Sequence, residues 1–197
     1  GKNILVGNRR LMSANKISIN NLEQDIQKLE KQGKTTVIVA IDKNAVGIIA
    51  VADTLKENAV EAVAGLKKIG VEVIMLTGDN EQTAQAIAKQ VGIDKVFANV
   101  LPGEKEEVIK KLKAEGKIVA MVGDGINDSP ALAQSNIGIA VGSGSDVAKE
   151  TGGIVLVKDD LRDVVLGIML SRATMNKIKQ NMFWALIYNV LAIPVAA

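Results

Sequence analysis

Two aspartates stand four positions apart in the glycine-rich segment Gly123 to Asp128, and their types and spacing suit metal and phosphate chemistry. The segment follows an apolar run, Ile118 to Val122, and precedes Ser129-Pro130, which predicts a strand, a loop and a helix with Ser129 as N-cap. Ligands of open parallel sheets bind in loops at the carboxyl ends of strands. We therefore expect Asp124 and Asp128 to offer hard oxygen ligands to Mg²⁺, which would hold a phosphate. A solvated turn is the alternative.

Two further segments are candidates for phosphate binding. Thr77-Gly78-Asp79 follows the apolar run Val71 to Leu76, and a hydroxyl with backbone amides at a strand end binds phosphate oxygens. A helix-capping turn with Asp79 or Asn80 explains the same residues. Lys105 lies in the first turn of a helix opened by Pro102, where its charge opposes the helix dipole. A phosphate contact accounts for this lysine, and a solvated side chain is the alternative.

The elements that must position these loops follow from hydrophobic periodicity. Residues 1–50 predict a strand at Ile4 to Val6, a helix ending near Gly33, and a hairpin of Thr35 to Ile41 with Val46 to Val51. Residues 51–158 predict a Rossmann-like, doubly wound parallel sheet with flanking helices. The helices expected there are 55–69, 81–91 and 102–116, and the strands are 71–76, 118–122, 137–141 and 154–157.

Composition narrows the classes of function. The 197 residues carry a net charge of +2, which gives no support for a nucleic-acid partner. No cysteine or histidine is present, which excludes disulfides, thiolate or histidine metal sites, and histidine acid–base catalysis within this chain. Hydrophobic residues make up 48% and aromatic residues 2%, so we expect a substantial core of aliphatic side chains.

The last region, residues 159–197, predicts a long helix that ends in the apolar run Phe183 to Ala197. This run is shorter than the roughly 20 residues that cross a bilayer, so a buried core helix is one interpretation. Basic residues precede it, as they do on the cytoplasmic side of a span: Arg172, Lys177 and Lys179. Because the chain lacks an initiator Met and stops inside the run, we expect a fragment of a longer polypeptide.

Several motifs together resemble the phosphorylation domain of P-type ATPases, members of the haloacid-dehalogenase-like superfamily. In order, they are Asp53-Thr54-Leu55-Lys56, Thr77-Gly78-Asp79-Asn80, Leu101-Pro102-Gly103-Glu104-Lys105 and Gly123-Asp124-Gly125-Ile126-Asn127-Asp128-Ser129-Pro130. Residues 138–148 extend the match. Residues 181–189, followed by Ile193-Pro194, are similar to a transmembrane helix of the heavy-metal branch, most of all the copper(I) exporters. Residues 1–50 resemble the closing part of a nucleotide-binding domain, with Gly7-Asn8-Arg9-Arg10 matching a nucleotide-side motif.

The resemblance implies an ATP-driven copper(I) export pump that works through an aspartyl phosphate. It divides the chain into the end of a nucleotide-binding domain (1–50), a phosphorylation domain without its first strand and nucleophile (51–158), and a connector with a truncated transmembrane helix (159–197). It implies that Asp124 ligates Mg²⁺ with support from Asp128 and Asn127. It also implies that Thr77, Gly78, Asp79 and Lys105 serve the phosphoryl group, Asp53 lies near a hinge, and Gly7 and Asn8 contact ATP.

The family's nucleophile, the aspartate of an Asp-Lys-Thr-Gly-Thr motif, is absent. The chain contains Asp42-Lys43 and Asp94-Lys95, and neither continues as that motif. In the family this aspartate lies upstream, so we expect the chain alone to form no phosphoenzyme. Tyr188 and Asn189 are the implied ligands of transported copper or silver, although Cu⁺ prefers soft sulfur ligands. Hydrogen bonding between helices is the alternative role of these two residues.

Two other functions stay open. One is a soluble, magnesium-dependent phosphatase of the same superfamily, against which the basic-then-apolar tail and the missing nucleophile argue. The other is a non-catalytic truncated module that binds phosphate or nucleotide. For the pump, the implied partners are ATP, the copper(I) ion, a membrane and the remainder of the same polypeptide, with residues 1–180 on the cytoplasmic side of the cell membrane.

Overall fold

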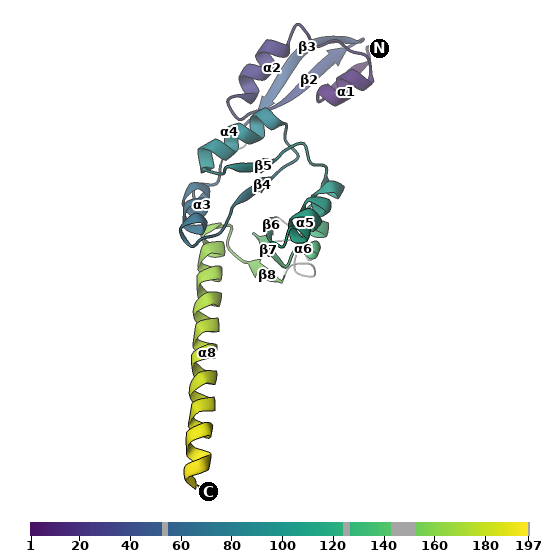
Figure 1. Cartoon of the computed structure of the whole chain (residues 1–197). Helices are drawn as coiled ribbons and strands as arrows, with labels where there is room; N and C mark the ends of the chain where they lie inside the picture. The colour runs from purple at the N-terminus through teal and green to yellow at the C-terminus, as the bar shows by residue number, and fades with distance from the viewer. Residues whose placement is uncertain (53–54, 124–126, 143–152, 197) are drawn as a thin grey trace.

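The computed structural model describes residues 1–52, 55–123, 127–142 and 153–196, which form three parts (Figure 1). An antiparallel N-terminal unit, residues 1–51, lies at one end, and an α/β part follows it. A single helix, α8 (Arg162–Ala196), extends away from the α/β part, so the two ends of the chain lie at opposite ends of the molecule. The predicted α/β class with parallel strands and flanking helices is confirmed.

The N-terminal unit packs two helices against one antiparallel sheet. Its elements are β1 (Ile4–Gly7), α1 (Arg9–Ala14), α2 (Glu23–Glu30), β2 (Thr35–Ile41) and β3 (Asn44–Val51). Asp42 and Lys43 adopt φ values of 47° and 67°, the left-handed conformation of a tight hairpin turn, which confirms the predicted hairpin. The unit has a core of its own, made of Met12, Ile17, Ile26, Ile38, Ala40 and Ala45.

The α/β part alternates helix and strand, as the sequence predicts. After α3 (Ala59–Lys68) come β4 (Ile74–Leu76), α4 (Glu81–Val91), β5 (Lys95–Phe97), the 3₁₀ turn η1 (Pro102–Glu104), α5 (Lys105–Ala114), β6 (Ala120–Gly123), α6 (Ser129–Gln134), β7 (Ile137–Val141) and β8 (Ile154–Leu156). The strands pair in parallel as β4-β5 and as β6-β7-β8.

The clearest differences from the prediction concern two expected elements and one strand that was not expected. The first helix begins at Ala59, and Leu55 lies outside it and is exposed. The strand expected at 71–76 is limited to Ile74–Leu76, because only these residues face a partner, β5, and all three are half-buried. The sequence did not predict β5, whose three residues are too few for a periodic signal and which exists through its pairing with β4.

The predicted single sheet is present as two pieces. Within the described residues β4 pairs only with β5 and β6 only with β7, so each of these strands has one edge without a partner strand. The pieces belong to one body, because Leu76 at the end of β4 packs against Ile109, Met121, Ala131 and Leu132 of the other piece. Parallel strands are normally covered and paired, so the free edges of β4 and β6 can accept a further strand.

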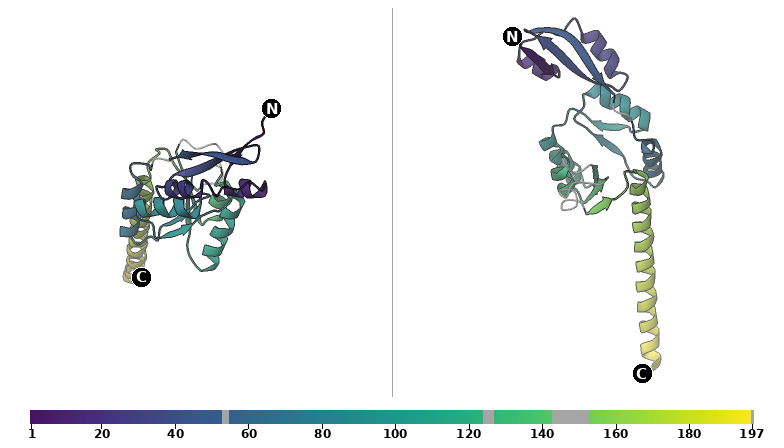
Figure 2. Two further views of the ribbon diagram at one scale, coloured as in Figure 1. Left: turned by 90° about the horizontal axis from the view of Figure 1, so that it is seen from above. Right: turned by 180° about the vertical axis from the view of Figure 1, so that it is seen from behind.

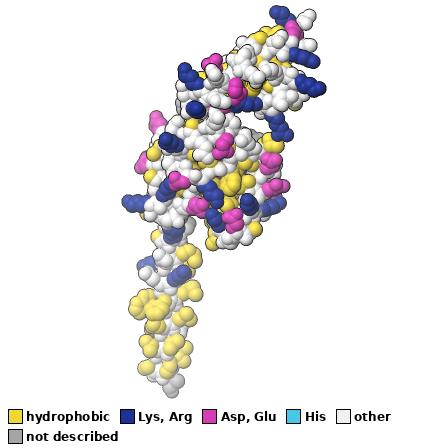
Figure 3. Space-filling view, turned by 45° about the horizontal axis from the view of Figure 1, so that its top comes forward, with side chains coloured by type: hydrophobic (Ala, Val, Ile, Leu, Met, Phe, Trp, Pro, Cys, Tyr) yellow, Lys and Arg dark blue, Asp and Glu magenta, His cyan; other side chains and the backbone are white. Residues whose placement is uncertain are grey.

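Helix α8 is attached to the α/β part through α3. Gly65 of α3 lies so close to α8 that a Cβ on it would approach a valine side chain to 3.2 Å. Two arginines of α8 bond opposite ends of α3: Arg162 reaches Glu61 at 3.1 Å and Arg172 donates to the Ile69 carbonyl at 2.7 Å. Beyond this contact α8 projects freely (Figure 2), and its far half is covered with apolar side chains (Figure 3).

Candidate functional site

The structure joins two of the predicted site residues, Lys105 and Asp128, in an ion pair. Lys105 Nζ lies 2.6 Å from Asp128 Oδ1, and the two side chains are only 16% and 14% exposed. Lys105 begins α5 and Asp128 directly precedes α6, so different crossovers of the α/β part supply the two charges. This carboxylate explains how a lysine is tolerated in a first helical turn, where the helix dipole opposes it.

The end of β6 leaves room for the Asp128 carboxylate. A Cβ on Gly123 would lie 2.5 Å from Asp128 Oδ2, so a larger residue there would displace the carboxylate. The prediction that Ser129 caps α6 is wrong: Asp128 takes the N-cap position and Ser129 is the first helical residue. Asp128 makes no side-chain capping bond to α6, because its carboxylate is bonded to Lys105 instead.

Thr77 and Asp79 form a compact turn at the carboxyl end of β4. Thr77 Oγ1 donates to Asp79 Oδ2 at 2.9 Å, and the Asp79 amide donates back to Thr77 Oγ1 at 3.1 Å. The hydroxyl of Thr35, from the N-terminal unit, donates to the second carboxylate oxygen at 3.1 Å. Asn80 rather than Asp79 is the N-cap of α4, since its side chain accepts from the Thr83 amide.

Other predicted residues of the phosphate site are exposed or lie outside the described residues. Within the described ranges no hydrogen bond joins the Thr77 turn to the Lys105–Asp128 pair, and Asn127 is exposed. Asp53 and Asp124 lie outside the described residues. In the part of the chain that the structure describes, no three acidic, His or Cys side chains gather as a metal site.

A polar cavity of about 370 Å³ lies where the N-terminal unit meets the loops after β4 and β5. Asn8 and Arg10 of the N-terminal unit line one side of it. Asp79, which follows β4, and Asn99, which follows β5, line the other. Asn8 also caps α1, accepting a hydrogen bond from a backbone amide at 3.0 Å, and Gly7 ends β1 directly before it. The structure thus puts the predicted nucleotide residue Asn8 and the predicted phosphate-loop residue Asp79 around one cavity.

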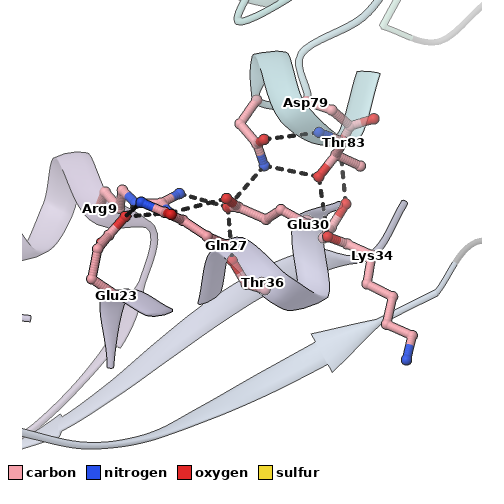
Figure 4. A network of polar contacts seen from close by, with 10 residues as sticks. Arg9, Glu23, Gln27, Glu30, Lys34, Thr36, Asp79 and Thr83 are labelled. Carbon is pink, nitrogen blue, oxygen red and sulfur yellow. Dashed lines mark hydrogen bonds and ion pairs between the residues drawn. The ribbon is translucent and has the colours of Figure 1, made fainter. Parts of the chain in front are cut away.

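A charged network that the sequence did not predict lines part of this cavity through Arg9 and Glu30 (Figure 4). Arg9 Nη1 donates to Glu30 at 2.5 Å and Nη2 donates to Glu23 at 2.9 Å. These bonds, that to Glu30 above all, raise the pKa of Arg9, and the bond from Arg9 lowers the pKa of Glu23. One signal was available: Glu23 and Glu30 stand seven residues apart on the same face of α2 as buried Ile26.

The two residues proposed to bind copper are both on the apolar half of α8. Tyr188 is 71% exposed, and the Asn189 amide donates to the Ala185 carbonyl of its own helix at 3.0 Å. No described helix has both the length and the apolar content to cross a membrane.

Comparison with known proteins shows the relatives of this chain. The chain is 60% identical over 195 residues to a probable copper-exporting P-type ATPase of Archaeoglobus fulgidus. The aligned region covers 98% of this chain and 24% of that protein. It is 52% identical over its whole length to the copper-exporting P-type ATPase of Bacillus subtilis, of which it covers 25%. The chain therefore spans about a quarter of the length of these relatives.

The solved structures that resemble this chain are also of ATPases. A zinc-transporting PIB-type ATPase in its E2·Pi state matches all of this chain with a TM-score of 0.74 and 39% identity, over 32% of that chain. The catalytic domain of the CPx-ATPase CopB-B matches 66% of this chain with a TM-score of 0.54 and 31% identity, over 51% of that chain. The sequence profile of the haloacid dehalogenase-like hydrolases covers residues 1–136. On this match, and on the parallel α/β part that carries Lys105 and Asp128, the chain belongs to the haloacid dehalogenase-like hydrolase family.

Proposed function

We propose that this chain is the phosphorylation-domain segment of an ATP-driven copper(I) export pump. Residues 1–50 complete a nucleotide-binding domain, residues 51–158 form the phosphorylation domain, and residues 159–197 lead into a transmembrane helix. Identities of 60% and 52% to copper-exporting P-type ATPases, over nearly the whole chain, support this proposal. The complete pump is then a multi-pass protein of the cell membrane, with residues 1–180 on its cytoplasmic side.

The mostly buried pair of Lys105 and Asp128 is the observation that carries the proposal. An ammonium group and a carboxylate 2.6 Å apart are the two charges that a metal-bound phosphoryl group needs. Lys105 would contact phosphoryl oxygens, and its charge would offset the negative charge that develops on them during transfer. Asp128 would face the cation that accompanies the phosphate.

The donor set fits Mg²⁺, which proteins usually hold through one or two carboxylates together with waters and substrate phosphates. Asp128 and Asp124 would be those carboxylates, with Asn127 beside them. Bound there, the ion supplies positive charge to the phosphoryl oxygens. The chain's own contribution is to fix Asp128 against Gly123 and to keep a lysine next to it.

Thr77 and Gly78 would bind phosphoryl oxygens through a hydroxyl and backbone amides. Asp79 accepts hydrogen bonds from Thr77 and from Thr35, and would therefore orient the Thr77 hydroxyl. Nucleotide would reach this point across the cavity that Asn8 lines. Gly7 would allow the nucleotide to approach the backbone, and Asp53 would lie near the hinge between the two domains.

In this proposal the nucleophile would come from polypeptide outside residues 1–197. The free edges of β4 and β6 fit a further parallel strand between the two pieces of the sheet, and a carboxylate at its end would lie among the loops already described. Its oxygen would attack the γ-phosphorus as the bond to the β–γ bridging oxygen breaks and ADP leaves. Water would then hydrolyse the acyl phosphate, which releases inorganic phosphate and restores the carboxylate.

For the cargo, Tyr188 and Asn189 of α8 would contact copper(I) in the membrane. Polar side chains in an apolar span are functional candidates, and the Asn189 amide already bonds its own helix, so its carbonyl oxygen is the group that remains for an ion. Exchange of Tyr188 for Phe in the complete pump should lower copper-stimulated ATP hydrolysis and leave phosphorylation by inorganic phosphate intact.

Labelling with [γ-³²P]ATP tests the proposal. The complete polypeptide should form an acid-stable, hydroxylamine-sensitive phosphoenzyme with Mg²⁺, and the isolated chain should form none. Asp124→Asn and Lys105→Met in the complete protein should abolish the label while the fold persists. Lys110→Met is the matched control, because Lys110 lies in the same helix and its ion pair with Glu106 joins side chains that are 54% and 33% exposed. Full labelling of the Lys105 variant, or label on the isolated chain, would contradict the assignment.

A further inference from the structure

The N-terminal unit is joined to α4 by a narrow polar seam. Three hydrogen bonds of 3.1 Å cross it, each between the end of α2 or the start of β2 and the residues around the N-terminus of α4. They run from Asn80 to Glu30, from Thr35 to Asp79 and from Thr83 to the Lys34 carbonyl. Figure 4 shows them converging on the region between the two units.

Glu30 is the charged centre of this seam. Its side chain is 2% exposed, which would be costly for an unpaired carboxylate. Arg9 donates two hydrogen bonds to it, at 2.5 and 3.0 Å, and Thr36 donates one at 3.1 Å. Asn80 gives the fourth, and this bond alone comes from outside the N-terminal unit. Asn80 therefore bonds a carboxylate that Arg9 and Thr36 of the N-terminal unit already hold in place.

Apolar packing contributes little across the seam. The cluster around Met12 and Ile26 lies wholly within the N-terminal unit, and those around Ile109 and Val63 lie wholly outside it. Among the described glycines, Gly33 lies against α4, with 3.6 Å between its Cβ position and Ile87. A contact made of a few directional bonds is released more readily than a shared hydrophobic core, as in interfaces between mobile domains.

We propose that the Glu30–Asn80 bond is an interdomain latch. Closed, it fixes Asn8 and Arg10 opposite Asp79 and Asn99 and so sets the width of the cavity between them. Opened, it frees the N-terminal unit to move as a body while Arg9 keeps Glu30 neutralised. The latch concerns the arrangement of the two units, so it holds whether or not the chain turns over a nucleotide.

Pulsed electron–electron resonance on the full chain tests the latch. Because the sequence contains no cysteine, Gln24→Cys and Glu107→Cys place two spin labels on exposed sites of α2 and α5. Asn80→Asp keeps a good N-cap for α4 but sets a carboxylate against Glu30. We expect it to lose the single narrow distance peak of the parent. Asn80→Ser keeps a cap without a new charge and should broaden the peak.

Two further variants decide the interpretation. The exchange Glu30→Gln with Asn80→Asp swaps amide and carboxylate across the same bond, and it should restore the narrow peak. Glu23→Gln removes another partner of Arg9 but no bond across the seam, and it should leave the peak unchanged. An unchanged peak in both Asn80 variants would overturn the proposal. So would equal broadening in Glu23→Gln, because the seam is intact in that variant.

Discussion

The strongest quantitative prediction concerns the Lys105–Asp128 pair. Lys105→Met keeps the aliphatic stem but removes the ammonium group, which leaves a carboxylate that is 14% exposed without this partner. Removing one member of a buried pair costs about 3–5 kcal/mol, whereas an exposed pair contributes about 0–1 kcal/mol. Because both side chains are much nearer the buried limit, we expect a loss of about 2–3 kcal/mol in the free energy of unfolding.

The substitution Asp128→Asn removes the charge of the second partner but keeps the shape of its side chain. Asp128→Asn retains the volume of the side chain and an oxygen that Lys105 can still bond, so its cost should be about 1 kcal/mol. In the double variant no uncompensated charge remains. It should therefore be less destabilised than the sum of the single variants, with a coupling of about 1–2 kcal/mol.

Urea unfolding followed by far-ultraviolet circular dichroism, in a mild detergent that keeps α8 soluble, measures these values. Lys110→Met serves as the control, since its pair with Glu106 joins side chains that are 54% and 33% exposed and should cost less than about 0.5 kcal/mol. Additivity of the two single variants within about 0.3 kcal/mol would refute the reasoning, because that is the behaviour of sites that do not interact.

Two other predictions concern the attachment of α8. Gly167→Ala should stabilise the chain by about 0.5–1 kcal/mol through helix propensity, since its Cβ would meet open space. Gly65→Ala should stabilise it less, because its Cβ would press on Val165 at 3.2 Å. The unfolding temperatures of the two variants check this order. Hydrogen bonds from Arg162 lower the pKa of Asp160 from 3.8 to about 2, so this pair stabilises the fold above pH 3.8 and the stabilisation is lost as the pH falls toward 2. A carboxyl titration by NMR should show that value, and Arg162→Gln should return it toward 3.8.

Local features of the structure could be predicted from the sequence. The hairpin at Asp42-Lys43, the helix Glu81–Val91 and the strand–loop–helix order around Gly123 depend on neighbouring residues, through turn conformation, capping and periodicity. The motifs around Thr77, Lys105 and Asp128 identified the loops that carry the candidate chemistry. The sequence did not predict β5, because this short strand forms through its pairing with β4. It also missed the N-cap of α6, because the carboxylate of that residue, Asp128, is bonded to the distant Lys105.

Which charges meet depends on the tertiary structure. Lys105 is 23 residues from Asp128, and Glu30 is 50 residues from Asn80, so no local pattern links them. The separation of the parallel strands into two pieces is also invisible to periodicity, because pairing is a property of neighbours in space. The kind and the order of most helices and strands, and the loops that carry reactive residues, follow from the sequence alone, because these features depend on short-range preferences. Which side chains become partners depends on the fold. Burying an unpaired charge is costly, so the folded arrangement places each buried charge next to one of opposite sign.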